Sequence, residues 1–253
     1  MPRHAIDISE EDGVRYLHFG SEWVQGAMRI RRPWSLELDY TREMLFGLLL
    51  REPPWPKRAL LIGLGAGSLA KFLWRHLPET RITVVEINPQ VPRVAQQFFR
   101  LPPEDERLEI IIGDGAAFAE SVAATRQRFD LILVDGFDHN ARVGALDSQA
   151  FYAHCRGCLG RSGILATNLF RSRGLRASLA RVDAAFAQRR LALPPLEAGN
   201  TIAIAASGSP IHVTCDELRE QAIRLKRETG LDLAPTIGRL QLTQPMPDGL
   251  LSL

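Results

Sequence analysis

The sequence predicts a doubly wound α/β fold: a mostly parallel sheet of seven strands, covered by helices on both faces. Three observations predict it. From residue 58 onward, short apolar runs alternate with segments of helical periodicity, and the last two apolar runs are joined by a link too short for a helical crossover. Before residue 33, two stretches alternate apolar and polar residues, as strands do. We therefore expect a β-hairpin extension with a linking helix over residues 1–52, and the main domain over residues 53–253.

The N-terminal extension should begin with the strands VRYLHFG (14–20) and EWVQGAMRIRR (22–32). DYTREMLFGLLLRE (39–52) has helical spacing, with an apolar face formed by Met44, Leu45, Leu48 and Leu49. PPWP (53–56) should end this linking helix, because proline cannot continue one. Three tryptophans are expected to pack between the extension and the main domain rather than to stack on a substrate: Trp23, Trp34 and Trp55.

The main domain should contain five parallel strands joined by helices. The expected strands are RALLIGLG (58–65), RITVVEIN (81–88), LEIIIGDG (108–115), FDLILVDGF (129–137) and GILATNLF (163–170). The expected helices are SLAKFLWRHL (68–77), PQVPRVAQQFFR (89–100), AAFAESVAATR (116–126), SQAFYAHCRGCL (148–159) and LRASLARVDAAFAQR (175–189). Strands that are apolar throughout are typical of a sheet buried on both faces.

The sheet should close with an antiparallel strand. LALPPLE (191–197) and NTIAIAAS (200–207) are separated by a short link, so we expect them to pair as neighbours and one of them to run against the rest. The segment DELREQAIRLKRETGLDL (216–233) predicts an amphipathic helix with its charges on one side.

Composition argues against several classes of protein. The chain has 253 residues, 45% of them hydrophobic and 24% charged, and a formal net charge of +2, so no strong overall field favours nucleic acid or a membrane surface. No stretch reaches transmembrane length, and the first residues contain no apolar run typical of a signal peptide. We therefore expect a cytoplasmic protein without a membrane partner.

Three cysteines do not indicate a disulfide framework. Cys155 and Cys158 form one CxxC, and His212 with Cys215 could supply two further zinc ligands. Zinc would require all four to converge, and nothing in their spacing requires that. We expect no metal, and interpret the CxxC as two partly buried thiols on a helix.

A glycine turn follows the first strand of the main domain, with Gly63, Gly65 and Gly67 at alternate positions. In an open parallel sheet, ligands bind beyond the carboxyl ends of the strands, where glycines allow close backbone approach and a helix N-terminus favours negative groups. A strict dinucleotide fingerprint needs glycine where Ser68 stands, and a P-loop needs a lysine that is missing here. The turn alone is a weak signal.

Three carboxylates strengthen this signal, because they end the next three strands. Glu86 stands at the distance from the turn that is typical of a carboxylate receiving ribose hydroxyls. Asp114 could accept from an adenine amino group, and Asp135 should point into the same crevice. Each could instead be a solvated or helix-capping carboxylate. Together with the glycine turn, they indicate a nucleoside site.

From about residue 58 to 170, the sequence resembles the class I S-adenosylmethionine-dependent methyltransferase fold, which is Rossmann-like, and within it the spermidine synthase (polyamine aminopropyltransferase) family. The resemblance is carried by LLIGLGAGSLAKFL, VVEINPQV, IIIGDGAAF and LILVDGFDH. Glu37 and Tyr40 also match the family's entry segment. The resemblance implies decarboxylated S-adenosylmethionine or S-adenosylmethionine as co-substrate, an amine as acceptor, and a homodimer.

The resemblance also implies roles for individual residues. It assigns the co-substrate to Gln25, Gly63, Gly65, Gly67, Glu86, Ile87, Asp114, Gly115 and Asp135. It makes Asp135 the catalytic residue that receives the attacking amine, with Asp138 beside it. His139 is either a further base or an exposed loop histidine.

The sequence departs from the family pattern at several positions. Ala66 replaces the turn aspartate that binds the amino end of the ligand, and Leu36 replaces the first aspartate of the entry segment. Gly136, Phe137 and His139 replace the family's residues after the catalytic aspartate. Because a polyamine needs several carboxylates in its groove, we expect the fold and the nucleoside site to carry over, and polyamine specificity not to.

Two other classes of function remain open. A methyltransferase could use the same pocket with intact S-adenosylmethionine, and Ala66 would disturb it less. A binding module without catalysis is the other class. Residues 171–190 contain six arginines that could contact phosphates, but Phe186 is their only aromatic neighbour, so we favour a solvated helix face over nucleic-acid binding.

Overall fold

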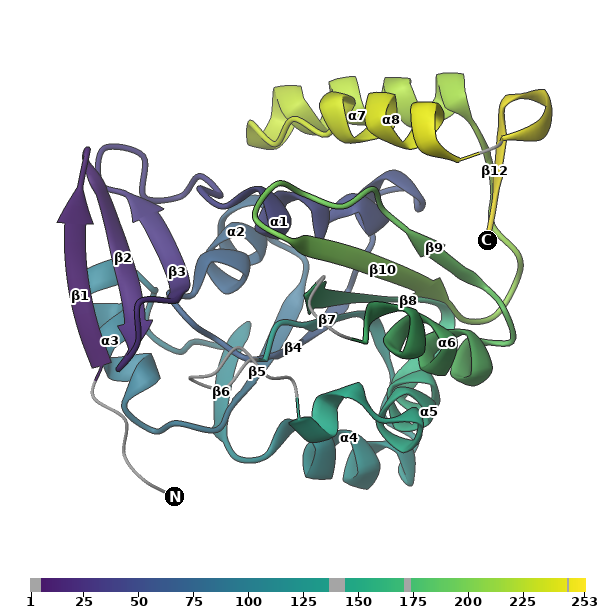
Figure 1. Cartoon of the computed structure of the whole chain (residues 1–253). Coiled ribbons are helices and arrows are strands. Elements are labelled where there is room, and N and C mark those ends of the chain that lie inside the picture. The colour runs from purple at the N-terminus through teal and green to yellow at the C-terminus, as the bar shows by residue number, and fades with distance from the viewer. Residues whose placement is uncertain (1–5, 137–143, 171–173, 245) are drawn as a thin grey trace.

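A computed structural model describes residues 6–136, 144–170, 174–244 and 246–253. Its centre is a seven-stranded sheet with the order β6-β5-β4-β7-β8-β10-β9 (Figure 1). These strands are β4 (Arg58–Ile62), β5 (Arg81–Glu86), β6 (Leu108–Ile112), β7 (Phe129–Val134), β8 (Leu159–Phe170), β9 (Arg190–Ala192) and β10 (Asn200–Ala206). The predicted doubly wound fold is confirmed: β4 to β8 are parallel, and β10 runs antiparallel to both β8 and β9. The antiparallel strand lies inside the sheet, with β9 at its edge.

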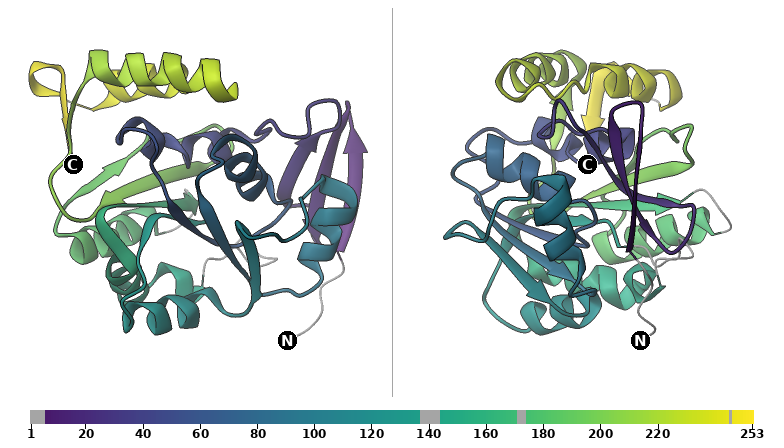
Figure 2. Two further views of the ribbon diagram at one scale, coloured as in Figure 1. Left: turned by 180° about the vertical axis from the view of Figure 1, so that it is seen from behind. Right: turned by 90° about the vertical axis from the view of Figure 1, so that its left-hand side faces the viewer.

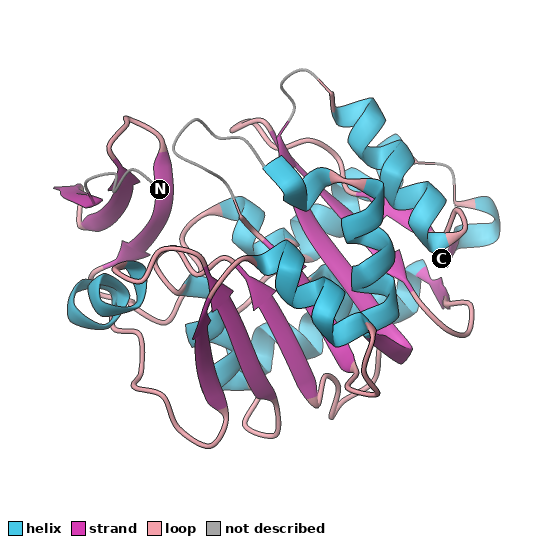
Figure 3. Cartoon of the chain, turned by 90° about the horizontal axis from the view of Figure 1, so that it is seen from below, coloured by secondary structure: helices cyan, strands magenta, loops and turns pink. Residues whose placement is uncertain are grey.

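Helices cover both faces of the sheet. One face packs against α2 (Ser68–His76), α3 (Val91–Phe99) and the segment 39–50, and the other against α4 (Gly115–Ala123), α5 (Gln149–Cys158) and α6 (Leu175–Phe186). Helices α7 (Cys215–Thr229) and α8 (Ala234–Thr243) form an outer layer over the segment 39–50. Figure 3 shows helices packed across this second face. Successive side chains of a strand point to opposite faces, so Leu60 joins the second core and Leu61 the first. Burial of one such leucine contributes roughly 1.5–3 kcal/mol.

The N-terminal extension is a small antiparallel sheet of three strands. It consists of β1 (Ile6–Glu11), β2 (Val14–Phe19) and β3 (Val24–Arg29), and lies beside α3 (Figure 1). Strand β1 was not predicted, because only two of its six residues are apolar. The sheet packs through Leu17 and Met28 onto Ala66 and Phe99 of the main domain.

The linking helix is shorter than predicted. Residues 39–52 form only α1 (Asp39–Glu43) and the 3-10 turn η1 (Phe46–Leu49). The apolar residues from Met44 to Leu50 are all buried, so this segment has no solvated face to match a regular amphipathic helix. A Cβ on Gly47 would stand 3.2 Å from Ile164 of β8, which shows how closely the segment presses on the sheet.

The C-terminal part adds two helices and a small sheet. The predicted amphipathic helix is α7, which begins with a capping box between Thr214 and Glu217 and ends at Gly230. Helix α8 and the pair β11 (His212–Thr214) and β12 (Leu250–Ser252) were not predicted. Figure 2 shows α7 and α8 as a layer on top of the molecule. Two further 3-10 turns are η2 (Gly144–Asp147) and η3 (Pro247–Gly249). In the described ranges, no helix has both the length and the apolar character needed to span a membrane.

Candidate active site

The glycine turn is enclosed by protein backbone on two sides. Gly63, Gly65 and Gly67 all have positive φ angles, of 94°, 52° and 71°. A Cβ on Gly63 would stand 2.3 Å from the carbonyl oxygen of Asp135, and one on Gly65 would stand 2.7 Å from that of Gln25. The sequence suggested glycines for the approach of a ligand. The structure adds a second reason, since β3 and the end of β7 both contact the turn.

The carboxylate of Glu86 is hydrogen-bonded to the backbone of this turn. The side chain is 6% exposed. One carboxylate oxygen accepts from the backbone N–H of Leu64 at 2.9 Å, and the other from that of Asn88 at 2.8 Å. Burial raises the pKa of Glu86, and backbone N–H donors, including these two, oppose that rise. The adjacent Ile87 is 52% exposed at the same edge of the sheet.

Asp114 caps a helix, which is the structural alternative raised from the sequence. One of its oxygens accepts from the backbone N–H groups of Ala116 and Ala117, at 2.8 and 2.9 Å, at the start of α4. A Cβ on the neighbouring Gly115 would stand 2.3 Å from Ile62, so this glycine allows α4 to pack on β4.

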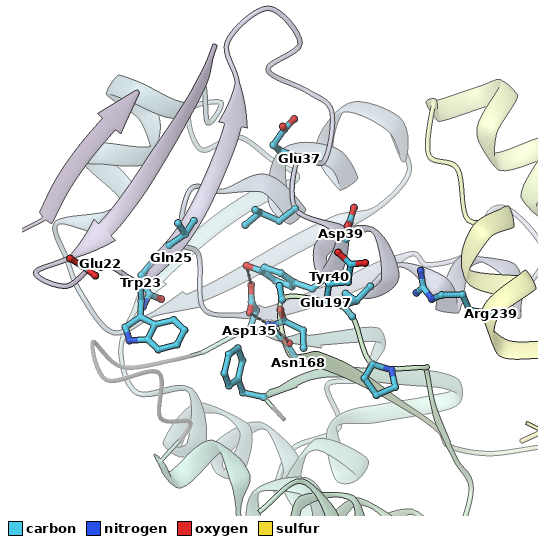
Figure 4. Close-up of a pocket in the computed structure, with 17 residues that line it drawn as sticks. Glu22, Trp23, Gln25, Glu37, Asp39, Tyr40, Asp135, Asn168, Glu197 and Arg239 are labelled. Carbon is cyan, nitrogen blue, oxygen red and sulfur yellow. Dashed lines mark hydrogen bonds between the residues drawn. The ribbon is translucent and has the colours of Figure 1, made fainter. Parts of the chain in front are cut away.

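Asp135 follows β7 and is the centre of a partly buried hydrogen-bond chain (Figure 4). Its Oδ2 accepts from the hydroxyl of Tyr40 at 3.1 Å, and its Oδ1 accepts from the amide of Asn168 at 2.9 Å. The Asn168 side-chain carbonyl in turn accepts from the amide of Asn200 at 2.9 Å. Burial raises the pKa of Asp135, partly opposed by its two donors. The Tyr40 pKa is raised well above its ordinary value by burial and by the nearby carboxylate.

Strand order brings the predicted carboxylates to one edge of the sheet, while their side chains have separate partners. Glu86, Asp114 and Asp135 follow or end the neighbouring strands β5, β6 and β7, with the glycine turn of β4 between them. Glu86 contacts the turn, Asp114 caps α4, and Asp135 lines a cavity. Phe137, Asp138 and His139 lie outside the described residues.

The cavity beside Asp135 has a volume of about 740 Å³ and is strongly acidic. Its carboxylates are Glu22, Glu37, Asp39, Asp135 and Glu197 (Figure 4). The sequence led us to expect a shortage of carboxylates here, and the cavity contradicts that expectation. Glu22, Asp39 and Glu197 were missed because they come from three distant segments and belong to no motif. The predicted Gln25 also lines the cavity.

Two of these carboxylates have cationic partners. Glu37 accepts from the Nε of Arg29 at 3.0 Å, and Asp39 accepts from Arg42 at 2.9 Å. Arg239 of α8 lines the same cavity and forms an ion pair with the buried Glu43 of α1. The acidic side chains still outnumber the basic side chain among the lining residues.

The cavity also has an aromatic wall. Trp23 and Phe170 meet edge to face, with ring centroids 5.6 Å apart. We expected Trp23 to be a packing residue, but it is 50% exposed and lines the cavity. An aromatic face next to carboxylates suits the methylenes and the charge of an alkylammonium ion.

Two of the substituted family positions, Ala66 and Leu36, are buried. Ala66 is 2% exposed, and a Cβ on Gly26 of β3 would stand 2.6 Å from the Ala66 Cβ. An aspartate at position 66 would therefore meet β3 in this fold. Leu36 belongs to the main apolar core.

The four residues considered for zinc lie in two separate places. Cys155 and Cys158 are buried in α5 under the sheet, where the Cys158 thiol donates to the carbonyl of Ala119. Cys215 and His212 belong to the C-terminal part, at the start of α7 and in β11. Within the described ranges, no group of three or more His, Cys, Asp or Glu side chains has a metal-binding arrangement.

Several arginines of residues 171–190 are used inside the fold. Arg181 pairs with Asp147 and Arg190 pairs with Asp183, each at 2.8 Å. These contacts tie α6 to η2 and to β9, so the arginines have a structural role that does not require nucleic acid.

A comparison with protein-family models matches residues 38–172 to the spermine/spermidine synthase domain. A polyamine aminopropyltransferase of Neisseria meningitidis is 38% identical over 241 residues, which cover 95% of this chain and 90% of that protein. The chain belongs to the spermine/spermidine synthase family. The matched range includes the glycine turn, Glu86, Asp114 and Asp135.

Solved structures agree with this family. Human methyltransferase-like protein 13, in complex with SAH, matches with a TM-score of 0.69 and 28% identity, over 76% of this chain and 93% of that chain. A spermidine synthase in complex with the transition-state analogue AdoDATO matches with a TM-score of 0.67 over 96% of this chain and 86% of that chain. Its identity is 19%, so the second likeness concerns the fold alone. This member of the spermine/spermidine synthase family thus shares its architecture with aminopropyltransferases and methyltransferases.

Proposed function

We propose that this chain transfers an aminopropyl group from decarboxylated S-adenosylmethionine to an amine acceptor. The observation that carries the proposal is the position of Asp135, beside the glycine turn and on a cavity with four further carboxylates. Such a cavity favours a cationic acceptor over a neutral or anionic one. The name of the Neisseria relative, polyamine aminopropyltransferase, supports the same activity.

The proposed reaction needs a neutral amine and a fixed line of attack. The amine nitrogen forms a bond to the carbon beside the sulfonium, while the carbon–sulfur bond breaks and its electron pair stays on sulfur. The products are a longer amine and methylthioadenosine. An amine arrives as an ammonium ion, and we assign the removal of its proton to Asp135. Burial supports this role, because it raises the Asp135 pKa and so makes the carboxylate a better proton acceptor near neutral pH.

We propose that the nucleoside lies along the strand ends next to Asp135. The glycine turn and Glu86 would receive the ribose, and the exposed Ile87 would contact the adenine. Asp114 and Gly115 would border the adenine, and Gln25 the propyl chain. The complex of the human relative with SAH supports a nucleoside of this class.

The substitution Asp135→Asn tests the catalytic assignment. We expect kcat to fall at least about 100-fold, because the amine loses its proton acceptor. Binding of methylthioadenosine, measured by calorimetric titration, should change little, since asparagine keeps the size of the side chain. Unchanged turnover would remove Asp135 from the mechanism.

Methyl transfer is a second candidate, and one observation favours it. Ala66 stands where the family resemblance places an aspartate for the amino end of the ligand, and β3 covers this position. Without that carboxylate, nothing at position 66 repels the amino-acid carboxylate of intact S-adenosylmethionine. Calorimetric titration with the intact and the decarboxylated compound separates the two functions. Aminopropyl transfer predicts tighter binding of the decarboxylated compound, and methyl transfer the reverse.

Four expectations from the sequence are also part of this proposal. We propose a cytoplasmic location, supported by three free cysteines, and a homodimer, supported by the family resemblance. We also propose that the chain divides into the extension (residues 1–52) and the main domain (residues 53–253). The extension should depend on the main domain for its stability, because Leu17 and Met28 are buried against Ala66 and Phe99. Finally, we propose that the reaction needs no metal, since the sulfonium supplies the leaving group.

A further inference from the structure

Two buried asparagines stand in the interior of the sheet, where asparagine is an unfavourable residue. Asn168 on β8 is 2% exposed and Asn200 on β10 is 8% exposed. A buried amide costs free energy unless its donors and acceptors are paired. Here the two amides pair with each other and with Asp135, so the chain of hydrogen bonds crosses from β10 through β8 to the end of β7.

Both ends of this chain favour the same direction of the Asn168 amide. An asparagine amide can present either its N–H group or its carbonyl to a neighbour. The carboxylate of Asp135 can only accept, and Asn200 donates to the carbonyl of Asn168, so both contacts turn the N–H group of Asn168 toward Asp135. With the amide of Asn168 reversed, its carbonyl oxygen would face the Asp135 carboxylate, and two acceptors would repel each other.

We propose that Asn200 is a positioning residue, which acts through Asn168 to keep the Asp135 carboxylate oriented and ready to accept the proton of the amine. This inference rests on the proposed function for its kinetic consequence. Its structural part, the control of the Asn168 amide by Asn200, stands independently of the reaction. Asn200 itself touches neither Asp135 nor the proton that moves.

The test replaces Asn200 by residues that cannot donate. Asn200→Leu removes the donor without adding charge, and Asn200→Asp offers an acceptor in its place. Where the leucine prevents folding, Asn200→Ala serves in its place. Thr201→Val is the matched control, because Thr201 is the next residue of β10 and its buried hydroxyl has no hydrogen-bond partner among the described residues. Near- and far-ultraviolet circular dichroism checks that each variant is folded.

The first readout does not depend on the reaction. Carbon-13 NMR of labelled aspartate carboxylates follows the titration of Asp135, whose signal is the one lost in Asp135→Asn. We expect the Asp135 pKa to rise in Asn200→Leu and in Asn200→Asp, because the carboxylate loses a reliable donor. The Thr201→Val control should match the wild type. A rise in Asn200→Asp alone would indicate simple charge repulsion and would overturn the proposal.

The second readout is kinetic. We expect kcat to fall about tenfold in Asn200→Leu, with the KM of the acceptor nearly unchanged, since the lost hydrogen bond orients the base rather than the substrate. An increased KM with unchanged kcat would make Asn200 an acceptor contact and would contradict the proposal. If the wild type transfers no aminopropyl group, the proposed function fails, and the NMR titration still decides the role of Asn200.

Discussion

Asp135 is a partly buried carboxylate whose two hydrogen-bond donors, Tyr40 and Asn168, are both neutral. Neutral donors orient a carboxylate without cancelling its charge, whereas an arginine would lower its pKa and weaken it as a base. The burial that raises the pKa of Asp135 also destabilises the fold, because a charged carboxylate is removed from water. At the residue scale, the burial that makes Asp135 a stronger base therefore also lowers the free energy of unfolding.

This exchange predicts a pH-dependent gain in stability for Asp135→Asn. A folded-state pKa above the unfolded one means that the folded protein binds more protons between the two values, so stability falls as pH rises through that window. Asp135→Asn has no carboxylate to titrate at this position, so its stability does not fall in this way. The variant should therefore unfold at a higher temperature than the wild type at pH 7. Its advantage should shrink as the pH falls toward the unfolded pKa of about 4. Thermal unfolding over this pH range measures it, and a lower Tm at pH 7 would contradict the account.

Lys71 is a second buried charge, and it predicts the opposite slope. Its Nζ donates to the carbonyls of Pro33 and Phe99, at 2.9 and 2.7 Å, and burial lowers its pKa from 10.5 to about 8. Between these two values the unfolded chain binds one more proton than the folded one, so stability rises with pH.

We therefore expect the wild type to gain about 3 kcal/mol relative to Lys71→Met as the pH rises from 8 to 10.5. Urea unfolding of both proteins across this range measures the difference, in which the titration of other groups cancels. A constant difference would show that Lys71 titrates normally.

At the element scale, the glycine turn is a point of contact between three parts of the chain. The turn connects β4 to α2, β3 presses on it through Gln25 and Gly26, and the end of β7 contacts it through Asp135. The close approach of backbone to backbone, and not only the positive φ angles, requires glycine here. The position of Asp135 therefore depends on the turn.

Two glycine substitutions separate strain from steric conflict. Gly13 has a φ of 74°, and a Cβ added there would meet nothing within 4 Å, whereas Gly63 has a φ of 94° and the Asp135 carbonyl at 2.3 Å. Gly13→Ala should cost about 1–2 kcal/mol from backbone conformation alone. Gly63→Ala should cost clearly more and reduce kcat, because Asp135 must move. Equal losses of stability in urea unfolding, with unchanged kcat in both, would contradict this.

The strands that were predicted correctly are those that have similar, apolar surroundings on both faces. Strands β4, β5 and β7 are mostly buried on both faces, so their largely apolar runs identify them in the sequence. The segment 39–52 was wrong as one helix because tertiary contacts surround it, and helical spacing cannot signal burial on every side. Strand β1 has only one face to bury, and its acidic residues conceal the two apolar ones.

At the scale of the whole molecule, the acidic cavity is a product of the fold and not of any motif. Glu22 comes from the N-terminal sheet, Asp39 from α1 and Glu197 from the loop between β9 and β10. The sequence revealed Asp135, Tyr40 and the glycine turn, because these have strand-end or family positions. It could not reveal the other carboxylates, because only the closing of the chain brings them together.

The carboxylates that the fold brings together in the cavity predict that binding of the acceptor depends on salt concentration. Raising the ionic strength should increase the KM of a diamine several-fold, since the attraction of separated charges is screened. Glu197→Gln should weaken that dependence, and Glu79→Gln, which alters a surface ion pair with Lys57 outside the lining residues, should leave it unchanged. A salt dependence identical in all three proteins would show that the cavity carboxylates do not attract the acceptor.

The identity of the transferred group is the central claim, and product analysis tests it most directly. The purified protein is incubated with 1,4-diaminobutane and either decarboxylated or intact S-adenosylmethionine, and the products are identified by mass spectrometry. We predict methylthioadenosine and a diamine extended by one aminopropyl group from the decarboxylated compound alone. A methylated amine from the intact compound, or no product from either, would contradict the account.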